Sequence, residues 1–389
     1  MGNRRFRSGI FSAPFYPVEE HTTLAIEREL ELIQWLDRLD YDEAWLGEHH
    51  SGGFEIMSSP ELLIAAAAER TKYIRLGTGV ISLPYHHPLT VAGRIVQLDH
   101  MTRGRMMFGV GPGALPVDAT MMGINPDHLR ERLMESLGVI IRLLSGETVT
   151  AKTDWFTLDQ ARLNIEPYTQ PYPEIAAAST FSPSGSRVVG KYGVGMLCLG
   201  ALQIEGTDAA VVNWRLANEL AAENGFTLDP ANLRLTGPMH IAETREQAEA
   251  DVRFGLEKWL DYFSSIAPGM KAKIAGMDAI TAVKSTYGAV IGTPDDAIAR
   301  IEELRGKLDF GCFLIFAHHW ADWDRTKKSY DLFARYVLPK LRRSDRVRRQ
   351  SLQFTLDNGE MISKALISSR NVIFEQHAAE RAAKARGDG

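Results

Sequence analysis

The spacing of apolar residues divides most of this chain into alternating short strands and amphipathic helices. Within residues 23–40, apolar side chains recur every three or four positions, which is the spacing of one helix face. Compact apolar runs at Gly9–Phe11 and Glu43–Gly47 lie on either side of it. Such runs are typical of buried parallel strands, so the pattern predicts a strand, a helix and a second strand here.

The same alternation continues to residue 341 and predicts eight strands, each followed by helix. The predicted strands are Gly9–Phe11, Glu43–Gly47, Ile74–Leu83, Arg105–Val110, Glu174–Ser179, Gly195–Leu199, Leu233–Ala242 and Cys312–Phe316. The predicted helices are 23–40, 59–67, 88–101, 130–144, 184–192, 209–222, 246–263, 297–304 and 326–341. Eight such units predict an α/β fold, a closed (β/α)8 TIM barrel, with two Rossmann-like halves as the alternative.

Three stretches do not follow this alternation. Residues 147–173 contain several prolines and indicate a hairpin-like insertion, and residues 267–292 form a candidate lid or substrate wall. We therefore predict a barrel domain over residues 1–342 and a C-terminal extension over 343–389. The extension has 9 basic and 6 acidic residues, and its apolar islands lie at 352–354 and 372–374. It is either a frayed tail or an arm that docks on another subunit.

Composition and charge exclude several classes of protein. The 389 residues include 44 Lys+Arg and 49 Asp+Glu, a net charge of −5 that gives no electrostatic case for binding nucleic acid. Two cysteines, Cys198 and Cys312, cannot form a disulfide scaffold. The longest apolar run, Leu62–Ala68, is far shorter than the roughly 20 residues of a membrane helix. We expect a cytoplasmic protein with no membrane partner.

Six of the 11 histidines form three adjacent pairs, at 49–50, 86–87 and 318–319. All three pairs follow predicted strands, so they gather at the end of the barrel where active sites lie. A metal hydrolase is one interpretation. However, neighbouring residues on a strand point to opposite sides, and no metal-binding spacing is present, so we expect no metal. For His50 and His86 we expect hydrogen bonds to backbone carbonyls at the rim.

A glycine-rich segment follows the fourth predicted strand. Gly109-x-Gly111-x-x-Ala114 is close to a dinucleotide-binding fingerprint, but Pro112 and Pro116 interrupt it and no helix opens inside it. The glycines more simply allow the backbone to approach a flat ligand or to make a tight turn.

A serine-rich segment, Ser182–Ser186, lies between the fifth predicted strand and its helix. Hydroxyls and free N–H groups at a helix start form an anion site suited to a phosphate, although an ordinary helix cap would also use them. A phosphate cradle, a glycine-lined wall and a nearby histidine together describe a phosphorylated planar cofactor such as FMN.

With these segments the sequence resembles the bacterial luciferase-like flavin-dependent monooxygenases, and within them the limonene 1,2-monooxygenase group. The resemblance spans about Phe6 to Leu341 and depends on five segments taken together. They are Asp42–His50, Leu76–Pro88, Asp99–Gly113, Ala178–Gly185 and Gly292–Asp296.

The resemblance implies a barrel that binds reduced FMN supplied by a separate flavin reductase. Reduced flavin reacts with O2 to a C4a-peroxyflavin, which inserts one oxygen atom into a small hydrophobic substrate, terpene-like by resemblance. A deazaflavin (F420)-dependent oxidoreductase of the same fold and a non-catalytic flavin-binding protein are the alternatives. Family habit suggests a homo-oligomer, dimer or tetramer.

The resemblance also assigns roles to residues. His49 matches the active-site histidine, which Glu48 would orient. Gly79 and Val80 match the wall under the isoalloxazine, where a cis peptide is typical. The phosphate site matches Ser182, Ser184, Gly185 and Ser186.

Two positions depart from the family pattern. Gly111 replaces the reactive cysteine of luciferase proper, and Pro112 stands where an arginine often binds the phosphate, which places more of that binding on the serines.

Six side chains are candidates for the substrate pocket. The expected apolar pocket comprises Phe11, Phe54, Met57, Met107, Phe156 and Trp320.

Overall fold

Eight parallel strands close into a barrel in the computed structural model, which describes residues 5–12, 15–203, 206–266 and 268–387. In order around the barrel they are β1 (Arg7–Ser12), β2 (Glu43–Leu46), β3 (Arg75–Thr78), β5 (Met106–Gly111), β8 (Glu174–Ser179), β9 (Gly195–Cys198), β10 (Leu233–Gly237) and β13 (Cys312–Phe316). Strand β1 pairs with both β2 and β13, which closes the ring. The predicted TIM barrel is confirmed.

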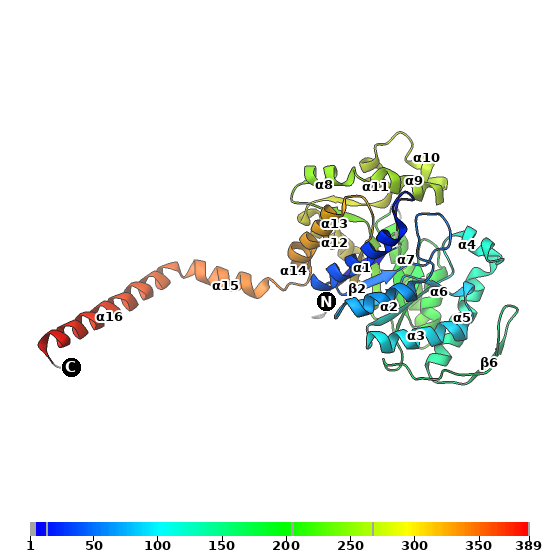
Figure 1. Cartoon of the computed structure of the whole chain (residues 1–389), viewed down its shortest axis with the longest axis horizontal. Helices are drawn as coiled ribbons and strands as arrows, with labels where there is room; N and C mark the ends of the chain where they lie inside the picture. Colours follow the sequence, from blue (N-terminus) through cyan, green and yellow to red (C-terminus); the bar gives the residue numbers. More distant parts are fainter. Residues whose placement is uncertain (1–4, 13–14, 204–205, 267, 388–389) are drawn as a thin grey trace. The chain divides into compact units, whose positions relative to one another are not determined.

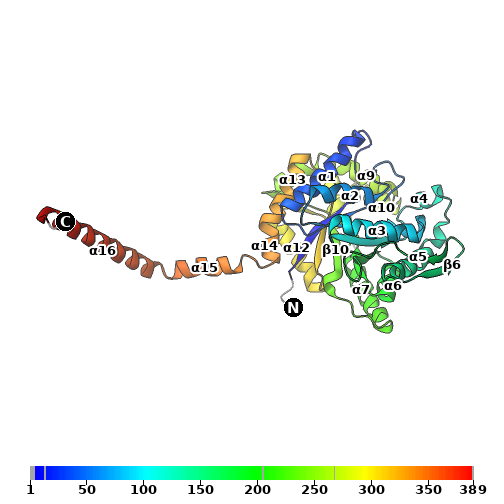
Figure 2. The ribbon, with the colours of Figure 1, turned by 60° about the horizontal axis from the view of Figure 1, so that its bottom comes forward.

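Helices cover the outside of the strands (Figures 1 and 2). The main ones are α1 (Thr22–Arg38), α2 (Pro60–Arg70), α3 (Pro88–Thr102), α5 (Leu129–Leu144), α6 (Ser184–Tyr192), α7 (Gly206–Glu223), α12 (Pro294–Lys307) and α13 (Trp323–Leu332). Helix α1 shows why the pattern works: Leu30, Ile33 and Leu36 are buried on one face. The apolar stripe read from the sequence is thus the face that covers the barrel.

Charged side chains and one indole fill the amino-terminal half of the barrel interior. Arg234 on β10 bonds to Glu43 (Nε–Oε2 2.6 Å) and to Glu174 (Nη2–Oε1 2.7 Å). The indole of Trp45 donates to Glu43 (2.8 Å), and a Cβ on Gly77 would lie 2.6 Å from its ring. Since Glu43 and Glu174 begin their strands, this layer leaves the carboxyl ends for a site.

Two predicted strands are shorter than the sequence indicated. The third predicted strand, Ile74–Leu83, ends at Thr78 and is followed by β4 (Ile81–Ser82) and a 3-10 turn, η1 (Leu83–Tyr85). The prediction over 233–242 is wrong beyond residue 237, because Pro238 has no N–H to continue the ladder. The chain then forms β11 (Met239–Ile241), which pairs with β12 (Val290–Gly292) outside the barrel.

Two predicted helices are interrupted. The helix over 246–263 is wrong as one element, because α8 (Arg245–Val252) and α9 (Leu256–Ile266) are separated at Gly255. The Gly255 amide donates to the Trp320 carbonyl (2.9 Å), and a Cβ there would lie 1.9 Å from the His319 oxygen. After α13 the chain passes through a π-helical turn, η4 (Phe333–Val337), to α14 (Leu338–Leu341).

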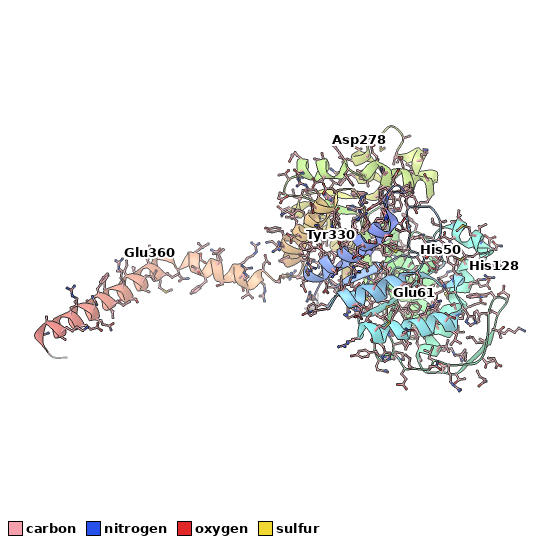
Figure 3. The ribbon with its side chains drawn as sticks, in the orientation of Figure 1. His50, Glu61, His128, Asp278, Tyr330 and Glu360 are labelled. Atoms are coloured by element: carbon pink, nitrogen blue, oxygen red, sulfur yellow. The ribbon has the colours of Figure 1, made fainter. Side chains whose placement is uncertain are left out.

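The insertions have the expected general form. Strands β6 (Val149–Lys152) and β7 (Thr157–Ala161) make the predicted antiparallel hairpin. The second insertion, whose residue 267 lies outside the described residues, forms α10 (Pro268–Lys273), α11 (Ala279–Tyr287) and β12. Asp278, labelled in Figure 3, caps α11 by accepting from the amides of Ile280 and Thr281. The sequence did not predict α4 (Pro116–Met121) or the 3-10 turns η2 (Pro126–His128) and η3 (Pro230–Asn232).

The chain divides into two units, one ending at Leu338 and one beginning at Pro339. The second contains α15 (Arg346–Asp357) and α16 (Gly359–Arg386), neither of which has a buried side chain. Among the residues that the structure describes, no helix combines the length and apolar character needed to cross a membrane.

Candidate active site

His49 lies between two buried carboxylates in the loop that follows β2. Its Nε2 is 2.6 Å from Glu55 Oε2, and its Nδ1 is 3.7 Å from Asp118 Oδ2. Tyr262 of α9 donates to the other oxygen of Glu55 (2.8 Å), and Ser51 donates to Asp118. The loop that carries His49 and two distant helices, α4 and α9, therefore hold one imidazole in place.

The two carboxylates favour the charged form of the imidazole. Burial disfavours the imidazolium, but Asp118 and Glu55 outweigh it and raise the pKa of His49 to about 9. In turn, His49 and Ser51 lower the pKa of Asp118 against the opposing effect of burial. His49 is therefore protonated at neutral pH and able to donate a proton.

We expect the substitution Glu55→Gln to lower the pKa of His49, because it removes one of the two anions that stabilise the imidazolium. An NMR titration of the ring measures this shift. The pKa of His49 in the fold lies above that of an unfolded histidine, about 6.5. Pairing with the carboxylates therefore stabilises the fold fully below pH 6.5, and this stabilisation is lost as the pH rises through about 9. An unchanged titration would contradict the assignment of Glu55.

Glu48 has other partners than His49. Its Oε1 accepts from Nε2 of His50 (2.9 Å) and of His86 (2.7 Å), and its Oε2 accepts from the Ser82 amide (2.7 Å). In the structure Glu55 and Asp118 orient His49, and Glu48 does not. This corrects the expectation for Glu48. The expectation that His50 (Figure 3) and His86 bond to carbonyls is also wrong, because they bond to this carboxylate.

A close-packed wall crosses the carboxyl ends of β3 and β5. The peptide bond between Gly79 and Val80 is cis, as the family resemblance leads us to expect. Thr78 Oγ1 donates to the Gly109 carbonyl (2.7 Å) and accepts from its amide (2.9 Å). A Cβ on Gly111 would lie 2.5 Å from a methyl group of Val80, so glycine is required for this approach.

The serine segment borders a cavity of about 440 Å³ at the start of α6. Ser182 and Ser184 line it and their hydroxyls are 2.8 Å apart. Gly185 allows α6 to pack on β8, because a Cβ there would lie 2.5 Å from the Ala178 oxygen. Ser186 is buried, and its Oγ has no hydrogen-bond partner among the described residues. Pro112 also lines the cavity.

Two arginines that the sequence analysis missed line the same cavity. Arg130 comes from α5 and Arg187 from α6, and within the described part of the chain neither forms an ion pair. Two free guanidinium groups beside a helix N-terminus suit a bound anion. The spacing of the sequence gave no signal for them, because an exposed arginine on a helix is ordinary.

The six candidate pocket residues fall into separate places. Phe11 and Met107 lie with Trp45 in the barrel interior. Phe54 and Trp320 belong to an aromatic cluster built with α9 and α11.

The two remaining candidates lie apart from these clusters. Met57 is buried, and its carbonyl accepts from the His49 amide (2.9 Å). Phe156 lies beside the turn between β6 and β7, edge-on to His87 and Trp155.

The third histidine pair serves packing. His318 bonds to the Met239 carbonyl (3.0 Å) and stacks on Trp320 with ring centroids 4.0 Å apart. Across the described ranges, no group of three or more His, Cys, Asp or Glu side chains is arranged to hold a metal ion.

Comparison with known proteins identifies the family and the fold. The model of the luciferase-like monooxygenase family matches residues 6–308. The chain belongs to this family. As a luciferase-like monooxygenase it is a flavin-dependent oxidoreductase.

Three relatives illustrate the similarity. Limonene 1,2-monooxygenase of Rhodococcus erythropolis is 48% identical over 332 residues, which cover 85% of each chain. The 4-hydroxyprotoasukamycin monooxygenase of Streptomyces nodosus subsp. asukaensis is 42% identical, over 86% of this chain and 92% of its own. The solved oxygenating constituent of 3,6-diketocamphane monooxygenase from Pseudomonas putida, in complex with FMN, shares the fold. Its TM-score is 0.73 at 24% identity, over 86% of this chain and 98% of that one.

Proposed function

We propose that this luciferase-like monooxygenase is the oxygenase component of a two-component system. It would take reduced FMN from a separate flavin reductase and use O2 to oxygenate a small hydrophobic molecule of terpene type. The similarity to limonene 1,2-monooxygenase supports the substrate class. The FMN-bound oxygenating constituent of the diketocamphane enzyme supports the cofactor and the reductase.

The observation that carries the proposal is the set of polar and basic side chains that line the cavity at α6. Two serine hydroxyls, two guanidinium groups and the N-terminus of α6 line it with one carboxylate, that of Glu131, and this excess of donors fits a phosphate ester. Ser182, Ser184, Arg130 and Arg187 would hold the FMN phosphate. The wall at Gly79–Val80 would lie against the ring system.

Reduced FMN, when bound, supplies the activation of O2, and the protein supplies proton control and shelter. The protonated ring of His49 faces Glu55 at Nε2 and Asp118 at Nδ1. It would donate its proton to the oxygen atom that leaves as water. Val80, Leu199 and Phe316 are partly buried apolar side chains that pack on the barrel-interior cluster. They would exclude water and favour a hydrophobic substrate.

The proposal is tested by mixing the protein, anaerobically loaded with reduced FMN, with 18O2 in the presence of limonene as probe. We expect a product with one labelled oxygen atom, and flavin reoxidation kinetics that differ from those of free reduced FMN. Unchanged reoxidation without labelled product would contradict the proposal. Anaerobic reduction of a ketone by reduced F420 would instead establish the deazaflavin alternative.

The double substitution Arg130→Met/Arg187→Met is expected to weaken binding of reduced FMN about tenfold to a hundredfold, because charge-assisted hydrogen bonds to the phosphate are lost. Anaerobic fluorescence titration measures the dissociation constant. Riboflavin, which lacks the phosphate, is the control ligand and should bind both proteins equally. An equal loss for riboflavin would mean that the arginines support the fold of the cavity instead.

A further inference from the structure

The two carboxylate oxygens of Glu55, the buried acid beside His49, are held in different ways. Oε1 accepts a hydrogen bond from the Tyr262 hydroxyl at 2.8 Å. Oε2 lies 2.6 Å from Nε2 of His49, but among the described residues it has no partner in hydrogen-bond geometry. The contact with His49 is therefore a close ion pair, and the bond from Tyr262 is the directional one that fixes how the carboxylate is turned.

The ring of Tyr262 is buried in an aromatic group that does not depend on its hydroxyl. Its centroid lies 4.8 Å from that of Phe54 and 5.4 Å from that of Phe15. A Cβ on Gly52 would lie 3.1 Å from the hydroxyl oxygen, so the loop after β2 closes directly on this group. Replacing Tyr262 by phenylalanine therefore removes the hydrogen bond to Glu55 and leaves the packing of the ring in place.

Helix α9, which carries Tyr262, lies outside the barrel in the segment between β11 and β12, and Figure 1 shows it beside α11. Trp259 of α9 packs edge-on against Trp320, which follows β13, with ring centroids 5.3 Å apart. It also packs against Tyr287 of α11, at 4.9 Å. A segment outside the barrel thus supplies the hydrogen bond that orients a carboxylate on a barrel loop.

Two further titratable groups lie at this end of the barrel. Asp118 of α4 faces Nδ1 of His49 at 3.7 Å. Tyr85 of η1 stays neutral at physiological pH, because burial and Asp118 raise its pKa to about 12. Within the described ranges neither group forms a hydrogen bond or ion pair with Glu55. Tyr262 also stays a donor, because burial and Glu55 raise its pKa far above the ordinary value.

We propose that Tyr262 is a positioning residue of the active site, whose hydroxyl holds Glu55 so that Oε2 faces His49 and keeps the imidazole charged. The assignment rests on the proposed function, in which His49 is the proton donor. It extends the active site from the barrel loops to α9. Tyr262 acts through Glu55 and donates no proton to the reaction, because its phenol stays protonated.

An NMR titration of His49 tests this role without any flavin chemistry. Tyr262→Phe should lower the pKa of His49 by about one pH unit, because Glu55 is no longer held against the ring. In the Glu55→Gln background the same substitution should cause no further fall, since the hydroxyl acts through the carboxylate. An unchanged pKa in the single variant, or an equal fall in both backgrounds, would overturn the proposal.

Tyr287→Phe is the matched control, because Tyr287 belongs to the same aromatic cluster as Tyr262. It loses the same atom, but in the described chain its hydroxyl has no bond to Glu55, so the titration of His49 should not change. A fall as large as that in Tyr262→Phe would mean that any loss from the cluster disturbs His49, and it would overturn the assignment.

The pH profile of a single turnover with reduced FMN is the second readout. In the unmodified protein the rate should decline above the pKa of His49, about 9, because the neutral ring cannot donate. In Tyr262→Phe the decline should begin about one pH unit lower, and a profile that does not move would overturn the proposal. If the protein oxygenates nothing, the proposed function fails, and the NMR titration still decides the role of Tyr262.

Discussion

Substitution of His49 by alanine is expected to slow oxygenation by about 100-fold or more, because it removes the group that we assign to proton transfer. Binding of reduced FMN should change little, since the phosphate cavity is formed by other side chains. Single-turnover kinetics with reduced FMN and O2 measure the rate, and anaerobic titration measures binding. The two effects separate proton transfer from cofactor affinity.

The control for His49 is another histidine with an ordinary role. His100 bonds to the Glu166 carbonyl (2.9 Å) on the exposed side of α3. His100→Ala should leave turnover unchanged. If His49→Ala oxygenates at the normal rate, the role assigned to His49 is wrong, whatever the cofactor affinity.

The substitution Arg234→Met is expected to lower the free energy of unfolding by about 3–5 kcal/mol, because it leaves the buried Glu43 carboxylate without its main partner. Denaturant unfolding at neutral pH measures the loss. Arg245→Met is the control: Arg245 pairs with Asp296 at the surface, so its removal should change stability only slightly.

The stability effect also has a defined pH dependence. Burial would raise the pKa of Glu43, but Arg234 and Arg7 outweigh it and lower the pKa to about 2. A lowered pKa stabilises the fold above the unfolded value of about 4.3, and this contribution disappears as the pH falls towards 2. The difference between wild type and Arg234→Met should therefore shrink in acid. A constant difference would argue against the ion pair as its cause.

The sequence by itself determined the barrel and predicted where its site lies. Strand and helix periodicities are local, so eight βα units could be counted and confirmed without any tertiary information. The carboxyl-end rule then directed attention to His49, the glycines after β5 and the serines before α6. Local patterns failed at Pro238, where the missing N–H of proline ends the strand, and at Gly255, where contacts with residues 319 and 320 interrupt the helix.

Only the tertiary structure decided the surroundings of those residues. Asp118 meets His49 from a distant segment, Tyr262 holds the neighbouring Glu55, and Arg130 lines one cavity with Ser182 across more than 50 positions of the chain. Such carboxylates and arginines carry no periodic signal, and their partners depend on how loops close over the barrel. The sequence therefore predicts which strand ends carry chemistry, whereas the packed fold sets the charged neighbours of His49 and the side chains that line the cavity at α6.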